Sequence, residues 1–287
     1  MRAISGEKNK INLAQDKNRQ GYRGRCQGRL SIVGIGPGDT SLLSLRALKA
    51  INKCQVIVGY TTYIKLLEDL IRNKEVISSG MTEEIKRVKL AIKKALAGKD
   101  VCLVCSGDPG VYGMAGLALE LLNKEEIDRI KIEIIPGIIA ASSCASLLGA
   151  PLMHDFAVIS LSDLLTDMQL IKQRIKKACA GDFVIVFYNP RSKKRTRPLK
   201  KAWQILMEHK SPNTPVGIVR NAERDNTEVI ITILKDMLSY AEKIDMTTVI
   251  IVGNAHTFVK ARYMITPRGY KLNGFDSNRN KLQNSVY

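Results

Sequence analysis

Between residues 30 and 135, short apolar runs alternate with amphipathic runs, and this order constrains the fold more than any other feature. The runs RLSIVGIG and DVCLVCSG are apolar and end in glycine, which is typical of strands buried on both faces of a sheet. The intervening runs carry apolar residues at helical spacing: one is expected to begin at Thr40 or Ser41, and another to end at Gly98. Strand–helix alternation predicts right-handed βαβ units, so we expect an α/β fold with a parallel sheet.

The alternation becomes less regular after PGIIAASSCASLLGAPL, where we expect the junction between two αβα domains. The runs PVGIVRN and TEVIITIL are separated only by a short polar turn at residues 222–226, which predicts an antiparallel pair. We therefore expect an N-terminal α/β domain over residues 30–140 and a C-terminal α/β domain over residues 141–272. Residues 1–29 are basic and aperiodic and are expected to form a disordered extension, and residues 273–287 a flexible tail.

The formal net charge is +18, and two-thirds of it lies outside residues 1–29. A basic body favours an acidic partner, such as nucleic acid, an anionic membrane face or a polyanionic small molecule. Solvated helix faces or a basic proteome would produce the same charge, so both interpretations stay open at this point. No apolar run approaches the roughly 20 residues of a membrane span, and we expect neither a membrane partner nor a secretory signal.

Six cysteines are present, and most lie in apolar runs where cysteine packs as a small hydrophobic residue. Cys102 and Cys105 form a C-x-x-C motif, but they lie in one extended run, where residues three apart face opposite sides. This geometry disfavours a metal or redox pair. We expect a reduced, cytoplasmic protein without a metal site.

Three glycine-rich segments follow expected strands: GIGPGD, SGDPGVYG and PGIIAA. Ligands bind at the carboxyl ends of the strands in such sheets, so a site is expected there. The first segment lacks the G-x-G-x-x-G spacing of a dinucleotide loop, and the second strand ends at Tyr60 with no acid for a ribose, which disfavours a nicotinamide enzyme. Asp108, at the tip of the fourth strand, is either a ligand-binding carboxylate or the cap of an Asp-Pro turn.

With these segments in this order and spacing, the chain resembles the tetrapyrrole methylase family from about Leu30 to Tyr270. The blocks GAPLMHDFAVISLSDLLT, FYNPRSKKR, TTVIIVGN and ITPRGY resemble its precorrin-3B C17-methyltransferase branch. The resemblance implies two αβα domains with the active site in the interdomain cleft, S-adenosylmethionine as cofactor and a homodimer. It further implies C-methylation of a corrin-pathway tetrapyrrole at carbon 17, with ring contraction, in cobalamin biosynthesis.

The resemblance also implies the cofactor contacts by position. They are Pro37, Ser106, Gly107, Asp108, Val111, Ile139, Ala140, Asn189 and Ala222. Ile139 stands where the family has Thr, so only a backbone contact is carried over there. Tyr60 stands where the siroheme-type enzymes have Asp, so their acid–base assignment does not transfer, which argues for a different tetrapyrrole substrate.

Ring contraction requires protons to be moved, and a few side chains are candidates for this task. The catalytic candidates are Tyr60, Asp108, His154 and Asp155. His154, at the expected domain junction, is either catalytic or a packing residue. The candidates for binding the carboxylates of the substrate belong to one strand-end loop and are Arg191, Lys193, Lys194, Arg195 and Arg197. A solvated surface loop is the alternative.

Other functions stay open alongside this one. A member of the same family could act on another tetrapyrrole carbon or on RNA, and the substrate could be metal-free or contain cobalt. A non-catalytic nucleic-acid-binding protein would carry aromatic residues among its basic ones, but aromatic residues make up 5% of the chain and the basic loop has none. We therefore expect a polycarboxylate tetrapyrrole rather than nucleic acid as the partner.

Overall fold

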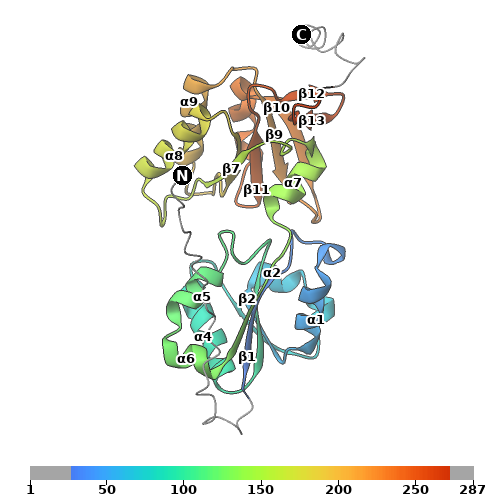
Figure 1. Cartoon of the computed structure of the whole chain (residues 1–287), viewed down its shortest axis with the longest axis vertical. Coiled ribbons are helices and arrows are strands. Elements are labelled where there is room, and N and C mark those ends of the chain that lie inside the picture. Colours follow the sequence, from blue (N-terminus) through green and yellow to red (C-terminus); the bar gives the residue numbers. More distant parts are fainter. Residues whose placement is uncertain (1–26, 272–287) are drawn as a thin grey trace, which may run out of the picture.

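The computed structural model describes residues 27–271, which form two α/β units stacked along the long axis of the molecule (Figure 1). The expected disordered extension, apart from residues 27–29, and the expected flexible tail lie outside the described residues. Residues 136–139 lead from the first unit into the helix α7 (Ala140–Leu148), which belongs to the second unit. No helix in the described part of the chain has the length and apolarity to cross a membrane.

The first unit is built on a five-stranded, fully parallel sheet with the order β3-β2-β4-β1-β5. Its strands are β1 (Arg29–Gly34), β2 (Val56–Tyr60), β3 (Glu75–Ser79), β4 (Asp100–Cys105) and β5 (Lys131–Ile135). The central strands β1 and β4 are buried along almost their whole length, because helices cover both faces of the sheet. The predicted parallel α/β fold is confirmed.

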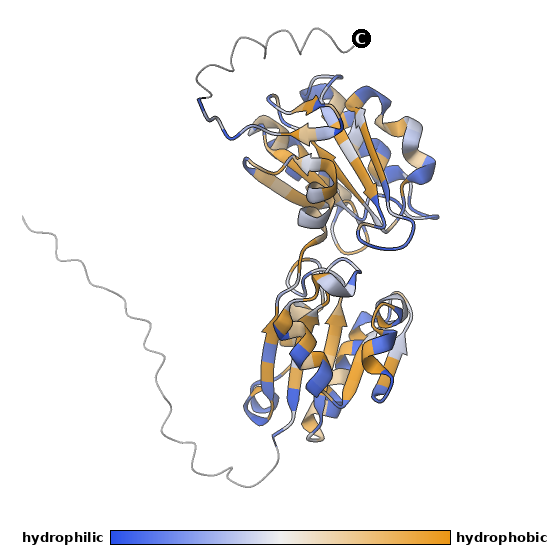
Figure 2. Ribbon diagram, turned by 90° about the vertical axis from the view of Figure 1, so that its right-hand side faces the viewer, coloured by the Kyte–Doolittle hydropathy of each residue, from blue (hydrophilic) through white to orange (hydrophobic). Residues whose placement is uncertain are grey.

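Helices on the two faces of this sheet enclose two separate apolar cores. The helices are α1 (Leu45–Lys53), α2 (Thr61–Lys65), α3 (Glu68–Ile71), α4 (Glu84–Leu96), α5 (Ala115–Leu121) and α6 (Lys124–Arg129). Val88 and Ala118 anchor α4 and α5 on one face, and Ile51 and Leu67 belong to the core on the other. Apolar strands accordingly lie between helices whose outward faces are hydrophilic (Figure 2).

The first predicted helix begins later than expected. A short 3-10 helix, Thr40–Leu42, comes first, and its cap is Asp39, whose carboxylate accepts a hydrogen bond from Ser41 N at 2.7 Å. The helix α1 then starts after Ser44, whose hydroxyl accepts from Ala47 N at 3.1 Å. The prediction of Thr40 or Ser41 as the α-helix cap was wrong, because Asp39 and Ser44 satisfy the exposed amide groups instead.

The second unit contains a five-stranded mixed sheet with the order β10-β9-β11-β8-β7. Its strands are β7 (Phe156–Ser160), β8 (Val184–Tyr188), β9 (Pro215–Arg220), β10 (Glu228–Ile233) and β11 (Thr248–Val252). The predicted antiparallel pairing of β9 with β10 is confirmed, and β11 is antiparallel to both of its neighbours. The helices α8 (Met168–Ala180), α9 (Arg197–His209) and the 3-10 helix η3 (Leu234–Lys243) contribute to one core, and α7 contributes to another.

A small third sheet was not predicted. It joins β6 (Gly149–Ala150), β12 (Phe258–Lys260) and β13 (Tyr263–Ile265) in the order β12-β13-β6. Strands of two or three residues are too short for an alternating pattern to be recognised.

The strand directions bring the loops of the two units face to face. In the second sheet, β7, β8 and β9 run in the same direction, so their carboxyl ends share one edge. This edge contacts the carboxyl ends of the first sheet, because Tyr112, after β4, hydrogen-bonds to β7, and Arg224, after β9, hydrogen-bonds to the loop after β1. The junction between the sheets therefore collects the strand-end loops of both.

Candidate active site between the two sheets

Three loops of the first unit meet at the carboxyl ends of β1, β4 and β5, and glycine makes their contact possible. Gly107 N donates to Gly36 O at 2.7 Å, and Gly36 N donates back to Gly107 O at 3.2 Å. A Cβ atom on Gly137 would lie 2.1 Å from Gly107 O, and a Cβ on Gly34 would lie 2.6 Å from the same oxygen. No side chain fits at those two positions, so these loops present backbone groups at the junction.

Asp108 holds two of these loops together. Its Oδ1 accepts from Gly110 N at 2.7 Å, and its Oδ2 accepts from Gly137 N at 3.0 Å. The carboxylate therefore caps its own turn and also ties the loop after β4 to the loop after β5. The turn-cap interpretation describes the observed contacts, and a contact of Asp108 with a ligand stays a prediction.

Tyr112 connects the loop after β4 to the second unit. Its hydroxyl donates to Val158 O at 3.2 Å and accepts from Ser160 N at 3.1 Å, so it pairs with the edge of β7. Its backbone has a positive φ of 54°, a strained conformation of the kind that clusters at functional sites. The ring lies edge-on to Tyr188, with centroids 5.5 Å apart. Tyr188 in turn accepts from Ala141 N at 2.7 Å, and burial raises its pKa to about 12.

Arg224 joins the two units from the turn between β9 and β10. Its Nε donates to Pro37 O at 2.6 Å, and its Nη2 donates to Ser106 Oγ at 2.8 Å. Burial of the guanidinium lowers its pKa. The sequence predicts only a polar turn for this segment, because a single arginine in a turn carries no periodic or motif signal.

The predicted cofactor positions come from both units, and the structure brings them to the same junction. Val111, Ile139 and Ala140 pack in one apolar cluster with the buried Ala222. Asn189, after β8, has a positive φ of 51° and donates to the hydroxyl of the serine that ends β7, at 3.1 Å. The remaining positions, Pro37, Ser106, Gly107 and Asp108, lie in the loops already described. Small residues and main-chain groups dominate this surface, so it suits a ligand held largely by backbone contacts.

Tyr60 ends β2 at the same edge of the first sheet. Its ring lies edge-on to Tyr63, with centroids 5.1 Å apart, and the guanidinium carbon of Arg87 lies 5.8 Å from its centroid. Arg87 is 3% exposed and donates to Ser79 Oγ at 2.8 Å and to Gly80 O at 2.6 Å. Within residues 27–271 it forms no ion pair. Arg87, which was not among the predicted site residues, is therefore a buried cation beside the ring of Tyr60.

The structure does not bring His154 and Asp155 to the junction. Both are exposed and precede β7, whereas the opposite end of β7, at Ser160, contacts the first unit. An extended chain from Asp155 to Ser160 spans about 16 Å. His154 Nδ1 accepts from Asp155 N at 2.8 Å, which is a local contact between neighbours. The length of a strand separates the pair from Tyr60 and Asp108, so we exclude both from the candidate site.

The predicted substrate-binding loop divides into two groups. Arg191 donates to a carbonyl and a carboxylate of η3, at 2.6 and 2.7 Å. Arg195 donates to the carbonyls that follow β7 and β8, at 2.7 and 2.9 Å. These two arginines hold the loop on the protein, and a contact of either with the substrate stays a prediction. The side chains of Lys193, Lys194 and Arg197 are exposed and have no hydrogen bond or ion pair with any described residue.

The buried thiols are structural. Cys102 and Cys105 belong to the cores on opposite faces of the first sheet, which confirms the predicted alternation. Burial raises the pKa of Cys105 to about 11 and that of Cys144 to about 12. Across residues 27–271, no group of three or more His, Cys, Asp or Glu side chains is arranged to hold a metal ion.

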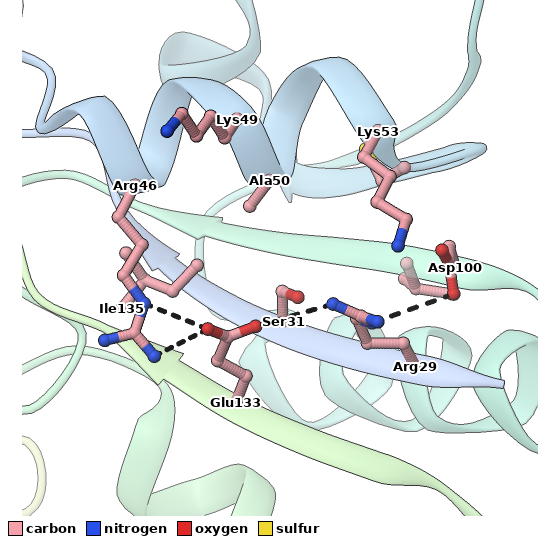
Figure 3. A pocket seen from close by; sticks show the side chains of 11 residues that line it. Arg29, Ser31, Arg46, Lys49, Ala50, Lys53, Asp100, Glu133 and Ile135 are labelled. Carbon is pink, nitrogen blue, oxygen red and sulfur yellow. Dashed lines mark hydrogen bonds and ion pairs between the residues drawn. The ribbon is translucent and has the colours of Figure 1, made fainter. Parts of the chain in front are cut away.

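A cavity of about 160 Å³ lies between α1 and the first sheet, towards the amino ends of β1 and β4 (Figure 3). Charged side chains in its wall pair with one another. Arg46 lies 2.6 Å from Glu133, and Arg29 lies 3.8 Å from Glu133 and 4.0 Å from Asp100. None of the predicted site residues lines this cavity, so we do not assign the candidate site to it.

Comparison with known sequences identifies close relatives. Cobalt-factor III methyltransferase of Priestia megaterium is 50% identical over 248 residues, which cover 85% of this chain and 46% of that protein, so the chain spans about half of it. A Salmonella typhimurium protein described as a probable cobalt-factor III C(17)-methyltransferase is 49% identical over 243 residues, covering 85% of this chain and all of that protein (100%). Precorrin-3B C(17)-methyltransferase of Sinorhizobium sp is 35% identical, covering 85% and 97%.

Solved structures agree with this grouping. The methyltransferase CobJ matches with a TM-score of 0.79 at 33% identity and covers 84% of this chain and 100% of its own. A uroporphyrin-III C-methyltransferase of Thermus thermophilus, complexed with S-adenosyl homocysteine, has a TM-score of 0.61 at 21% identity over 79% of this chain and 97% of its own, which shows a shared fold. The family model described as tetrapyrrole (corrin/porphyrin) methylases matches residues 29–238. The chain therefore belongs to the tetrapyrrole methylase family.

Proposed function

We propose that this chain transfers a methyl group from S-adenosylmethionine to carbon 17 of cobalt-factor III, with contraction of the macrocycle, in cobalamin biosynthesis. The observation that carries the proposal is the 49% identity with the Salmonella typhimurium protein over the whole length of that protein. Four relatives named for cobalt-factor III are 46–50% identical, whereas the precorrin-3B enzyme of Sinorhizobium sp is 35% identical. The higher identity favours the cobalt-containing substrate.

The chemistry of the junction fits S-adenosylmethionine. Its loops expose backbone groups, because a Cβ on Gly34 or Gly137 would collide with the neighbouring loop. In the first turn of α7, Ala141 N donates to Tyr188, but the amide of Ala140 has no partner among the described residues, and an amide at a helix N-terminus favours a carboxylate. The S-adenosyl homocysteine complex of the uroporphyrin-III enzyme supports the same cofactor. When bound, the cofactor supplies an activated methyl group, and the predicted cofactor positions would hold it.

Methyl transfer from a sulfonium is an in-line displacement, so the main task of the protein is to align the reactants and exclude water. Two contacts between the units support this role. Tyr112 fixes the loop after β4 on β7, and Arg224 fixes the turn after β9 on Pro37 and Ser106. Together they hold the strand-end loops of both sheets in one arrangement.

We assign proton transfer during ring contraction to Tyr60. Its phenol can donate or accept a hydrogen bond, and Arg87 supports both its ring and the adjacent loop. Asp108 contributes by positioning, since both of its carboxylate oxygens already accept backbone hydrogen bonds. Tyr60→Phe is expected to bind S-adenosylhomocysteine normally and to lose at least about tenfold in turnover, within the range of general acid–base catalysis. Unchanged turnover would refute the assignment.

We also propose that Lys193, Lys194 and Arg197 receive carboxylates from the rim of the tetrapyrrole. All three side chains are exposed and without partners among the described residues, with Lys193 and Lys194 in the loop after β8 and Arg197 at the start of α9. The double variant Lys193→Met/Lys194→Met should raise the KM for the tetrapyrrole without changing the affinity for S-adenosylhomocysteine. The matched control is Lys235→Met, at the opposite edge of the sheet. Equal KM values in both variants would contradict this role.

We further propose that the chain forms a homodimer, as the family resemblance implies, and that it works in the cytoplasm. The described cysteines are free thiols, which is usual in reducing compartments. Light scattering coupled to size exclusion tests the dimer, and a monomer mass would reject it.

Mass spectrometry after incubation with S-adenosylmethionine tests the reaction. Cobalt-factor III, precorrin-3B and RNA are offered separately, and the expected product is cobalt-factor III heavier by one methyl group. Methylation of precorrin-3B alone would reject the cobalt-containing substrate. If neither tetrapyrrole is methylated although the protein still binds S-adenosylhomocysteine, the proposed substrate class is refuted. If RNA is methylated instead, RNA is the substrate.

A further inference from the structure

Arg224 is a cation placed where the two units meet. It projects from a turn of the second unit, and its Nε and Nη2 donate to Pro37 O and Ser106 Oγ of the first unit. Arg224 packs closely against Gly38, because a Cβ on Gly38 would lie 2.4 Å from the Cγ of Arg224. The guanidinium is thus fixed from both sides of the junction.

No carboxylate neutralises this guanidinium within residues 27–271. Its hydrogen bonds go to a carbonyl and a hydroxyl, and no ion pair includes it. The acidic residues on the neighbouring loops are committed elsewhere: Asp39 accepts from Ser41 N, and Asp108 accepts from two backbone amides. An arginine carries five N–H donors, so donors of Arg224 are left for a further acceptor.

The surroundings of Arg224 increase its need for an anion. The side chain is half-buried, and the titratable groups that interact with its charge are the phenol of Tyr63 and the thiol of Cys144. Burial raises the pKa of both, so both are neutral at physiological pH. A partly desolvated cation among neutral groups favours binding of an anion, and a guanidinium matches the geometry of a carboxylate.

We infer that Arg224 forms a carboxylate subsite of the active site, with its free guanidinium donors binding a carboxylate of a bound ligand while its other donors hold Pro37 and Ser106. The inference deepens the proposed function and rests on it for the identity of the ligands. Two sources offer this chemistry: the methionyl carboxylate of the cofactor and the side-chain carboxylates of the tetrapyrrole. In both cases the side chain of Arg224 binds the ligand and also aligns the two units.

Calorimetry with two nucleosides tests the cofactor as the source. S-adenosylhomocysteine carries the carboxylate, and 5′-methylthioadenosine lacks the whole amino-acid part, so both are titrated into wild type, Arg224→Met and Arg224→Lys. If Arg224 binds this carboxylate, Arg224→Met should weaken the binding of S-adenosylhomocysteine by about tenfold or more. Arg224→Lys should weaken it by less, because lysine keeps the charge. Binding of 5′-methylthioadenosine should change less than about threefold, which also proves that the variant is folded.

A second arm tests the tetrapyrrole as the source. The KM for cobalt-factor III and the quenching of protein fluorescence by uroporphyrin III, an unreactive polycarboxylate, are measured with the same proteins. A rise of about tenfold in this KM, or in the dissociation constant of uroporphyrin III obtained from the quenching, assigns the carboxylate to the substrate if both nucleosides bind normally. The matched control is Arg72→Met, whose exposed guanidinium pairs with Asp69 outside the junction.

Two results would overturn the inference. One is an Arg224→Met protein that binds both nucleosides and the tetrapyrroles as wild type does. The other is an equal loss of affinity for S-adenosylhomocysteine and 5′-methylthioadenosine, because Arg224 would then act only by aligning the units. If the wild-type protein does not methylate cobalt-factor III, the proposed function is refuted but the inference on Arg224 is not, because the nucleoside titrations require no turnover.

Discussion

Replacing Gly137 by alanine tests the closeness of the loops on which the candidate site depends. The new Cβ would lie 2.1 Å from Gly107 O, whereas Cβ atoms essentially never come within 3.0 Å, so the backbone must move apart. That movement also breaks the 3.0 Å hydrogen bond from Gly137 N to Asp108. Overpacking costs about 1–3 kcal/mol, and a lost hydrogen bond to a charged group costs about 1.5–3 kcal/mol. We expect the free energy of unfolding to fall by about 3 kcal/mol or more.

Urea denaturation measures this loss, with far-UV circular dichroism for both units and Trp203 fluorescence for the second unit. A loss of about 3 kcal/mol lowers the urea midpoint by about 1–3 M. Gly116→Ala is the matched control, because Gly116 lies in α5 with no atom within 4 Å of its Cβ position. Alanine is about 1 kcal/mol better than glycine inside a helix, so this control should stabilise the protein. Equal midpoints for Gly137→Ala and wild type would refute the argument that these loops have no room for side chains.

Other parts of the structure yield further predictions. Tyr188→Phe should lower the free energy of unfolding by about 1–3 kcal/mol, because a buried amide loses its acceptor. Tyr263→Phe, which removes a hydroxyl from an exposed side chain, should change it by less than about 0.5 kcal/mol, and similar values for the two variants would reject the reasoning. Arg195→Met should lower the urea midpoint, because the carbonyls after β7 and β8 lose their donor. The free energy of unfolding should also fall as the pH rises from 9 towards 11. Burial raises the pKa of Cys105 to about 11 and that of Cys144 to about 12, against 9.0 in the unfolded chain. The unfolded state therefore binds fewer protons than the folded state over this range. Cys105→Ala/Cys144→Ala should show a smaller fall over that range, and an identical fall would contradict this explanation.

Where the sequence pattern is long and regular, it predicts the structure well. The apolar runs of the first unit are strands in a parallel sheet, because a strand covered on both faces must be apolar throughout. The turn at residues 222–226 is too short for a crossover, and it does form an antiparallel hairpin. The sheet of β6, β12 and β13 was missed, since its strands are very short and the pairing of β6 with β13 joins residues more than a hundred positions apart.

The site was only partly predictable for a related reason. Glycine loops can be recognised in the sequence, because their spacing reflects close backbone approach. Whether an arginine binds a ligand or a carbonyl depends on what the fold places beside it. Arg195 and Lys193 lie two positions apart, yet one is held by main-chain oxygens and the other is exposed. Arg224 acquires its role from loops that are distant in the chain, whereas Arg87 acquires its role from the nearby loop at Gly80 and from the ring of Tyr60.

During synthesis on a ribosome, the two sheets become complete at very different times. The first sheet closes once β5 has emerged, before any strand of the second large sheet exists, so the first unit can fold early. In the second sheet, β11 lies between β8 and β9, although it is made after both of them. Until Thr248–Val252 emerges, these two apolar strands each present an unpaired edge, which is a site for association with other chains. A chain that stops just before β11 would therefore carry a folded first unit joined to an aggregation-prone half-sheet.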